Sequence, residues 1–156
     1  MKCIVPFLGK TKEKYIAEGI ADFSGRLERY VQLEIPILKE KKRTAKDDHV
    51  RALKEEAEAL RQAVPSTAKV VALDLTGRQL RSEDFAMLLT KWEDMGIREV
   101  VFLIGSSDGL DPDIARGADF TLSLSKMTFT HEMARLLLLE QLYRAFSIKA
   151  GTGYHK

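Results

Sequence analysis

The sequence has 156 residues, of which 45% are hydrophobic and 31% are charged. This length and balance suit a single globular domain, residues 1–156, and exclude a disordered chain, which would have fewer apolar residues or a larger net charge. The 25 Lys and Arg nearly balance the 23 Asp and Glu, which leaves a net charge of +2. That charge does not by itself indicate nucleic-acid binding, so any basic surface has to come from local clustering.

The N-terminal segment MKCIVPFLGK contains the single cysteine, Cys3, in a short apolar stretch. One cysteine cannot form an internal disulfide and fits a reducing compartment, where a small buried hydrophobe is a better interpretation than a nucleophile. The stretch is too short for the core of a signal peptide, and no apolar run approaches the length that spans a bilayer. We therefore expect a cytoplasmic protein that does not enter a membrane.

The predicted elements begin with a strand over residues 2–7, where Pro6 indicates a strand end or a sheet edge. Residues 15–30 repeat Tyr, Ile, Phe and Leu side chains at spacings of three and four, which predicts a helix. A second strand is predicted over residues 32–38, and Pro36 again favours an edge position.

Residues 39–46, KEKKRTAK, are a basic run with a single acid and are predicted to form an exposed loop. A solvated loop is the usual role of such a run, and contact with RNA phosphates is the alternative. Residues 47–64 predict a helix that Asp47 or Asp48 caps. Its expected apolar stripe consists of Val50, Leu53, Ala57 and Leu60.

The second half of the chain continues this alternation. Strands are predicted over residues 69–75, 99–104 and 120–124, and helices over residues 82–95, from residue 112, and over residues 130–148. Gly77 is expected to form a turn, Ser82 to cap the first of these helices, and Gly96 to follow its C-terminus. Pro112 suits the first turn of a short helix.

Strands and helices in this order predict an α/β fold with a mostly parallel sheet and helices on both faces. Open parallel sheets bind ligands beyond the C-terminal ends of their strands. Three loops leave such ends here, at residues 73–75, 105–110 and 124–129. The second loop, GSSDG, lacks both the G-x-G-x-x-G of dinucleotide sites and the G-K-[ST] of a P-loop. Each glycine alone is an ordinary turn residue, but the three loops together favour a ligand site.

Other kinds of chemistry find little support. His49, His131 and His155 stand too far apart in the sequence to suggest a metal site, and no G-x-S-x-G elbow indicates a hydrolase. After Glu140 the chain carries no acid and mixes basic with aromatic residues. That mixture suits RNA, whose phosphates meet cations and whose bases stack on aromatic rings. As a signal on its own this mixture is weak, and core packing is the better interpretation of Tyr143 and Phe146 on the last helix.

Three segments together resemble a known family. They are LIGSSDGL at residues 103–110, SLSKMTFTHEMARLLLLEQLYRAF at residues 123–146, and GYHK at residues 153–156. The N-terminal GK, the strand VVALDLTG and the total length agree as well. Over its whole length the chain is similar to the RlmH family, the bacterial 23S rRNA pseudouridine-N3 methyltransferases of the knotted SPOUT superfamily.

The resemblance implies a five-stranded parallel sheet whose C-terminal part threads a trefoil knot. It also implies a homodimer that acts on 23S rRNA within the ribosome, with S-adenosylmethionine as cofactor and no metal. The cofactor is expected to be held largely by backbone groups. The positions that match the family's cofactor site are Leu73, Gly105, Leu124, Ser125, Lys126, Met127, Thr128 and Phe129.

The catalytic group implied by the resemblance is Arg144, Tyr154 and His155, which dimer contacts would order over the partner's cofactor. N3 of the pseudouridine would attack the sulfonium methyl group in line, and its proton would be lost before or during the transfer. We expect Arg144 to bind RNA and stabilise negative charge, His155 to act as a base or hydrogen-bonding group, and Tyr154 to stack on or position the base. Alignment of the two reacting atoms should supply most of the rate.

Two positions depart from the family pattern. Ser106 stands where the family usually has glycine, so its side chain is expected to crowd the cofactor loop, or to strain it if the position has a positive φ. Lys156 replaces the arginine of some members, which keeps the charge but loses the bidentate fork.

Two other functions remain as alternatives. One is a knotted methyltransferase that acts on another RNA, such as a tRNA ribose. The other is a non-catalytic ribosome-binding module, in which Ser106 marks a decayed cofactor site. The modest net charge further suggests that recognition depends on the shape of an assembled ribosome and not on bulk attraction to RNA.

Overall fold

The structure is a computed structural model that describes residues 1–41, 43, 45 and 48–154. Five strands form one parallel sheet in the order β3-β1-β6-β5-β7, and two short strands, β2 and β4, form a second parallel pair. The parallel five-stranded sheet is therefore confirmed. The strands are β1 (Lys2–Ile4), β2 (Phe7–Leu8), β3 (Gln32–Glu34), β4 (Ile37–Leu38), β5 (Lys69–Arg78), β6 (Glu99–Leu103) and β7 (Phe120–Leu122).

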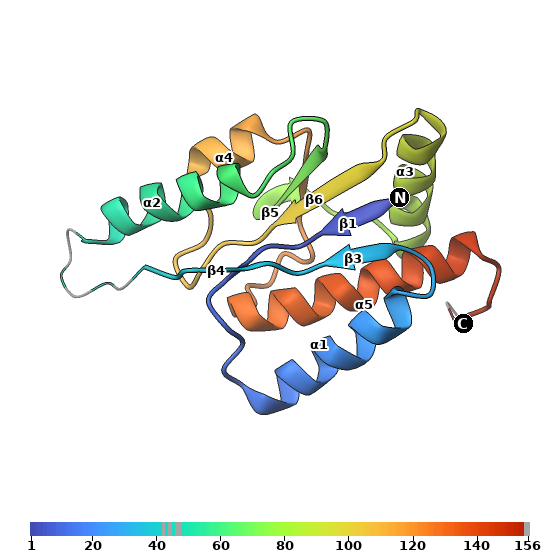
Figure 1. The fold of residues 1–156 in the computed structure, drawn as a ribbon, viewed down its shortest axis with the longest axis horizontal. Coiled ribbons are helices and arrows are strands. Elements are labelled where there is room, and N and C mark those ends of the chain that lie inside the picture. The colour runs from blue at the N-terminus through green and yellow to red at the C-terminus, as the bar shows by residue number, and fades with distance from the viewer. Residues whose placement is uncertain (42, 44, 46–47, 155–156) are drawn as a thin grey trace.

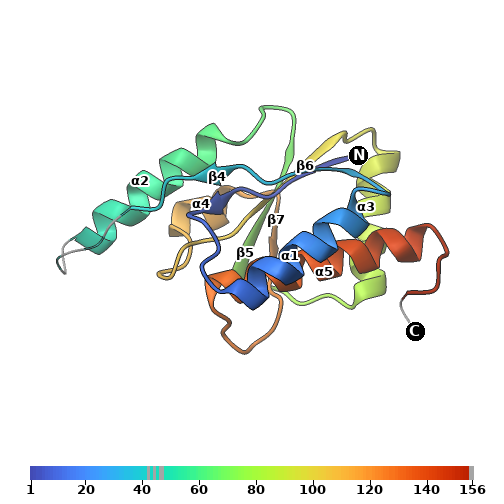
Figure 2. The same cartoon turned by 60° about the horizontal axis from the view of Figure 1, so that its bottom comes forward.

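Helices cover both faces of the sheet, as the alternation of elements predicted. Figures 1 and 2 show α1, α3 and α5 on one face and α2 and α4 on the other. The helices are α1 (Lys14–Leu27), α2 (Asp48–Gln62), α3 (Ser82–Asp94), α4 (Pro112–Gly117) and α5 (His131–Lys149). Within the described part of the chain, no helix is long and apolar enough to cross a bilayer.

The sheet separates two hydrophobic cores. Successive residues of β6 alternate between them, because side chains along a strand point to opposite faces. Phe102 packs in the larger core with Leu138 of α5, whereas Val101 and Leu103 pack in the smaller core with Leu60 of α2. All five side chains are at most 2% exposed. This two-sided burial is what a continuous apolar strand such as EVVFL predicts.

The first two predicted strands are each divided at a proline. Pro6 separates β1 from β2, and Pro36 separates β3 from β4. Proline has no N–H to donate, so the ladder of the main sheet ends there, and the chain continues as the separate β2–β4 pair. The strand before Pro36, β3, lies at the edge of the sheet as predicted, while Pro6 stands at the end of an interior strand.

Gly77 does not form the predicted turn. It lies inside β5, which extends beyond the predicted end at residue 75. A Cβ at Gly77 would lie 2.7 Å from the carbonyl carbon of Leu122, so β7 approaches the strand too closely for a side chain. Glycine is needed at this position because β7 comes so close to the irregular part of β5 between Leu73 and Arg78.

The predicted cap at Ser82 is also wrong. Arg81 occupies the N-cap position of α3 and makes no side-chain cap, while Ser82 is the first helical residue. The Ser82 hydroxyl donates instead to Gln141 Oε1 at 2.7 Å, which joins α3 to α5. On the second helix, α2 begins at Asp48, and Asp47 lies outside the described residues.

Other local predictions are confirmed. Gly96 has φ +80° directly after the C-cap of α3, and Pro112 stands in the first turn of α4. Cys3 is fully buried, and burial raises the pKa of its thiol to about 12, so it is a core side chain and not a reactive thiolate.

Candidate functional site

A cavity of about 610 Å³ opens beside residues 73–75 of β5 and at the C-terminal ends of β6 and β7. Small-molecule sites usually measure about 300–1,000 Å³. Because these strands are parallel neighbours, the three predicted segments meet at one edge of the sheet, although the first of them, residues 73–75, lies within β5 and not in a loop after it. The lining consists of residues 73–75, 104–110, 122–125 and 127–131, together with Ala134.

The loop after β6 folds back on itself at Gly105. Gly109 N donates to the carbonyl of Ser106 at 2.9 Å and closes a tight turn, with Gly109 at φ +82°. A Cβ at Gly105 would overlap the carbonyl group of Gly109 and lie 2.5 Å from Leu110 N. Only glycine therefore fits at position 105 while this turn forms one wall of the cavity.

The loop on β5 is an irregularity within the strand. Leu122 of β7 is paired with both Leu73 and Arg78, so residues 74–77 bulge out of the ladder. The Asp74 carboxylate accepts hydrogen bonds from Thr76 N at 2.8 Å and from its hydroxyl at 2.6 Å, which fixes the shape of the bulge. Leu73 and Asp74 thereby reach the cavity.

The loop between β7 and α5 is shaped by its serines. The buried Ser123 hydroxyl donates to the carbonyl of Ser125 at 2.9 Å, and the Ser125 hydroxyl accepts from Met127 N at 3.0 Å. The Thr130 hydroxyl then caps α5 by accepting from Met133 N. These bonds compete with regular structure and hold an irregular loop against the cavity. Met127, 74% exposed, projects from this loop.

The positions matched to a cofactor site are brought together with one exception. Seven of them line the cavity from three separate loops: Leu73, Gly105, Leu124, Ser125, Met127, Thr128 and Phe129. Lys126 is exposed and is not part of the lining. Its neighbours on both sides line the wall, so the side chain of Lys126 points elsewhere.

The charges along the cavity are acidic. Among its described lining residues are Asp74 and Asp108 but no lysine or arginine. The hydrogen bond from His49, aided by the charge of Arg43, holds the pKa of Asp108 below its usual value, so this carboxylate is ionised at neutral pH. Burial lowers the pKa of His131, so that imidazole is neutral. The wall suits a neutral or cationic ligand better than a polyphosphate.

Ser106 does not crowd the cavity, which corrects the expectation from the sequence. Its hydroxyl is bound on the side of α2, where it donates to Glu56 Oε2 at 2.8 Å and accepts from Arg43 Nη2 at 2.7 Å. No described residue other than glycine has a positive φ, so the backbone at Ser106 is unstrained. The serine is accommodated because its hydroxyl group is hydrogen-bonded to the side chains of Glu56 and Arg43.

These partners are not apparent from the sequence pattern. Arg43 belongs to the basic run that was predicted to be exposed, yet its side chain is 10% exposed. Glu56 is 2% exposed, whereas Val50, expected in the apolar stripe of this helix, is 64% exposed. The one available signal was spacing, since Glu56 stands four residues before the buried Leu60 and so shares its face. Lys42, Thr44 and Lys46 lie outside the described residues.

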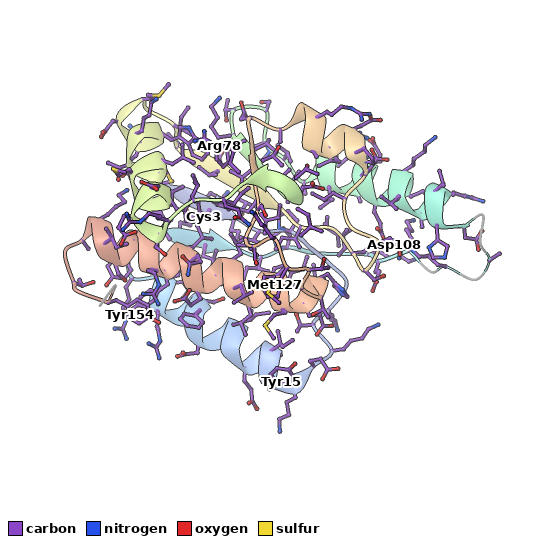
Figure 3. All side chains as sticks on the ribbon, turned by 180° about the vertical axis from the view of Figure 1, so that it is seen from behind. Cys3, Tyr15, Arg78, Asp108, Met127 and Tyr154 are labelled. Atoms are coloured by element: carbon purple, nitrogen blue, oxygen red, sulfur yellow. The ribbon has the colours of Figure 1, made fainter. Side chains whose placement is uncertain are left out.

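The catalytic residues implied by the resemblance lie elsewhere. Arg144 follows Ala134 of the cavity lining by ten residues, roughly 15 Å along α5. Tyr154 lies beside Arg144, with the guanidinium carbon 4.9 Å from the ring centroid. In Figure 3 the labelled Tyr154 and Met127 lie toward opposite ends of α5. The third residue, His155, lies outside the described residues.

Arg144 is held by its neighbours on α5 and the C-terminal segment. Its Nη2 and Nε donate to Glu140 Oε1 at 2.6 and 3.0 Å, and its Nη1 donates to the carbonyl of Tyr154 at 3.4 Å. The Tyr154 ring also packs edge-on against Tyr143, with centroids 4.6 Å apart. The aromatic residues of this helix are thus partly core, as expected, and they also fix a cationic guanidinium near the surface.

The HEMAR segment at the start of α5 has a structural role that the sequence did not reveal. The Glu132 carboxylate accepts hydrogen bonds from Lys12 N and Glu13 N at 2.8 and 3.0 Å. Arg135, 1% exposed, donates to the carbonyl of Leu8 at 2.6 Å and lies over the ring of Phe7. Arg135 therefore fastens α5 to β2, and Glu132 fastens it to the segment between β2 and α1, next to the cavity-lining residues His131 and Ala134.

Comparison with known proteins agrees with this architecture. A family model described as predicted SPOUT methyltransferase matches residues 1–155. The chain is 47% identical to the ribosomal RNA large subunit methyltransferase H of Desulfotalea psychrophila over 156 residues, which cover all of both chains. It is 42% identical to the protein of that name from Bifidobacterium adolescentis over 159 residues, again the whole of both.

The fold also matches a solved structure. A probable methylase family protein from Haemophilus influenzae Rd KW20 superposes with a TM-score of 0.56, over 99% of this chain and 70% of that one. The two sequences are 12% identical, so this likeness supports the fold alone.

Proposed function

The chain belongs to the SPOUT methyltransferase family, and on that premise we propose that it methylates N3 of a pseudouridine in 23S rRNA of the large ribosomal subunit, with S-adenosylmethionine as methyl donor. The names of its relatives support large-subunit ribosomal RNA as the substrate. The choice of pseudouridine rests on the resemblance of the C-terminal motifs. The observation that carries the proposal is the cavity where three loops meet at the C-terminal edge of the sheet.

The cavity suits this cofactor in size, lining and charge. About 610 Å³ can hold a nucleoside with an amino-acid arm. Leu73, Leu124 and Phe129 offer apolar surface to an adenosine, and the carboxylate of Asp74, which forms no ion pair with any described residue, favours a cationic ligand. S-adenosylmethionine would supply a methyl group on a positively charged sulfonium: a bond from a ring nitrogen to the methyl carbon would form as the carbon–sulfur bond breaks, and S-adenosylhomocysteine would leave as a neutral thioether.

We assign cofactor binding to the seven lining residues Leu73, Gly105, Leu124, Ser125, Met127, Thr128 and Phe129, and we leave Lys126 out. These residues line the cavity in segments where the regular strand ladder is interrupted or has ended, which is compatible with the backbone binding that the family resemblance implies. Ser125 has a supporting role, because its hydroxyl is already engaged with Met127 N.

We propose that the functional unit is a homodimer in which Arg144 and Tyr154 of one chain complete the cavity of the other. Within one chain these side chains are roughly 15 Å of helix from the cavity, too far for an arginine to reach a base beside the cofactor. Arg144 would stabilise negative charge on the base, and Tyr154 would stack on or position it. His155 keeps its proposed role as a base or hydrogen-bonding group.

We also expect the C-terminal part of the chain to be threaded as a trefoil knot and the protein to act in the cytoplasm. A net charge of +2 supports recognition of an assembled ribosomal surface over bulk attraction to RNA. Methylation of protein-free rRNA as fast as of intact ribosomes would contradict this part of the proposal.

The test is methyl transfer from labelled S-adenosylmethionine to ribosomes that lack this modification, with the modified nucleoside identified by mass. We expect 3-methylpseudouridine in 23S rRNA. A methylated nucleoside in a different RNA would show that the proposed substrate is wrong and that the protein is nevertheless an RNA methyltransferase. Absence of transfer together with absence of cofactor binding by calorimetry would favour a non-catalytic ribosome-binding module.

A further inference from the structure

Three buried polar side chains link the basic segment and α2 to the loop after β6. Glu56 and Ser106 are 2% and 3% exposed, and the side chain of Arg43 is 10% exposed. Arg43 Nη2 donates to Ser106 Oγ at 2.7 Å and to Glu56 Oε2 at 2.9 Å, while the Ser106 hydroxyl donates to Glu56 Oε2 at 2.8 Å. Each of the three side chains thus contacts the other two.

The same guanidinium holds a second residue of the loop. Arg43 Nε forms an ion pair with Asp108 Oδ2 at 2.5 Å, and His49 Nδ1 lies 2.8 Å from the same oxygen. Figure 3 shows the labelled Asp108 close to the beginning of α2. Arg43 is itself fixed, since its Nη1 donates to the carbonyl of Lys41, whose N–H donates to Glu56 Oε1.

A role in stability alone does not explain this network. Burying an ion pair costs desolvation energy, and apolar side chains of similar volume often stabilise a protein as well or better. What a densely bonded polar network adds is a single geometry, even though Arg43 Nε has only an ion-pair contact with Asp108 and no hydrogen bond to any described residue. Here the geometry that it fixes is the turn of residues 106–109, and that turn forms a wall of the cavity.

We propose that Arg43 and Glu56 are positioning residues of the cofactor site, which hold Ser106 and Asp108 so that the turn keeps the shape of the cavity wall. Neither Arg43 nor Glu56 lines the cavity, so they act through the turn and not on the ligand. The inference rests on the proposed function, in which this cavity binds S-adenosylmethionine. According to this proposal, a change in the basic segment that moves Arg43 also changes the affinity of the cavity for the cofactor.

The first experiment measures how stably the turn of residues 106–109 is formed in the absence of any ligand. Hydrogen exchange of the amides of residues 105–110 is compared in the wild type, Arg43→Ala and Ser106→Ala, of which the last removes one hydroxyl and keeps both charges. We expect faster exchange at Gly109 N, whose bond to the Ser106 carbonyl closes the turn, in both variants. The matched control is Arg51→Ala on α2, whose side chain is 81% exposed and pairs with Glu55.

The second experiment measures affinity for S-adenosylhomocysteine by calorimetry, and KM for S-adenosylmethionine and for ribosomes separately. We expect Arg43→Ala to weaken cofactor binding by at least about tenfold, since truncating a buried charge partner leaves the other charge unpaired. KM for ribosomes at saturating cofactor should be unchanged. Arg43→Lys should recover part of the loss, because it restores the charge but not the fork.

Folded Arg43→Ala and Ser106→Ala proteins with wild-type exchange in the turn and wild-type cofactor affinity would overturn the proposal. So would equal increases in exchange across the whole sheet, which would show a general loss of stability. Failure of the wild type to bind S-adenosylhomocysteine would instead count against the proposed function, and the exchange experiment would still decide whether Arg43 holds the turn.

Discussion

At the scale of single residues, Gly105 shows how one missing side chain permits the cavity. The turn formed by residues 106–109 folds back over position 105, and a Cβ there would overlap the Gly109 carbonyl. We predict that Gly105→Ala displaces the turn at a cost of about 1–3 kcal/mol. If the substitution raises the free energy of the cofactor-bound state by this amount relative to the free state, Kd for S-adenosylhomocysteine rises roughly 5- to 150-fold. Calorimetry on the folded variant measures it.

Gly25→Ala is the matched control for this substitution. Gly25 lies in α1 with no atom within 4 Å of its ideal Cβ and without a positive φ. Alanine there should leave cofactor affinity unchanged and stabilise the fold by about 0.5–1 kcal/mol, because glycine loses more freedom in a helix. Equal affinity in both variants would show that the turn adapts to a Cβ and that the Gly105 contact is unimportant.

Residue-scale detail is also where sequence and structure diverged. Gly77 was expected to turn the chain and Ser82 to cap a helix, but the first permits a close approach of β7 and the second joins two helices. In both cases the residue type signalled a special local requirement. Its nature depended on a neighbour distant in sequence, and no local pattern contains that information.

At the scale of elements, the start of α5 is fixed to the N-terminal segment by a buried carboxylate. Burial alone would raise the pKa of Glu132, but the hydrogen bonds from Lys12 N and Glu13 N outweigh it and hold the pKa below its usual 4.5. We predict that Glu132→Gln destabilises the protein by about 1–3 kcal/mol at pH 7, because its NH₂ group must face one of two N–H donors.

The pH dependence follows from the lowered pKa. The unfolded chain binds this proton more readily than the folded one, so the stabilisation is complete above the unfolded-state pKa and is lost as pH falls through the folded-state pKa. Urea unfolding between pH 7 and pH 3 should therefore show the difference between wild type and Glu132→Gln shrinking in acid. Glu18→Gln, exposed on α1, is the control and should show little change. A difference independent of pH would indicate lost packing instead.

Elements were the part of the fold most accessible from sequence. Continuous apolar runs such as EVVFL and helical spacings identified the strands and helices, because burial on two faces or on one stripe leaves a regular pattern. The two prolines predict strand ends or edges, but nothing in the sequence pattern predicts the separate β2–β4 pair that follows them. Pairing between distant short strands depends on the geometry of the whole sheet, which periodicity does not specify.

The candidate site was predictable where it depends on loop position and not where it depends on buried polar pairs. Parallel strands put their following loops at one edge, so the lining from Leu73 to Phe129 could be expected to converge. Arg43 and Glu56 lie in a charged run and a charged helix, for which solvent exposure is the reasonable expectation. Only the fold shows that they meet Ser106 away from water.

At the scale of the whole molecule, the site falls into two parts that one chain does not join. The cavity lies at the first turn of α5, and the cluster of Arg144, Tyr143 and Tyr154 lies toward its end. A helix is a rigid spacer, so no side-chain rotation removes this separation. A two-fold dimer offers a solution, because symmetry brings the cluster of each copy to the cavity of the other and creates two equivalent sites.

Heterodimers with defined substitutions distinguish sites shared between chains from sites within one chain. Two differently tagged chains are co-expressed and the mixed dimer is purified. Its activity is then measured at a cofactor concentration that leaves Gly105→Ala cavities empty. If sites are shared, a dimer with Gly105→Ala on one chain and Arg144→Ala on the other keeps one intact site and about half of the wild-type activity. A dimer with both substitutions on one chain and a wild-type partner has none. If each chain holds its own site, the first dimer is inactive and the second keeps half, so the two arrangements give opposite results and the proposal of a shared site stands or falls on them.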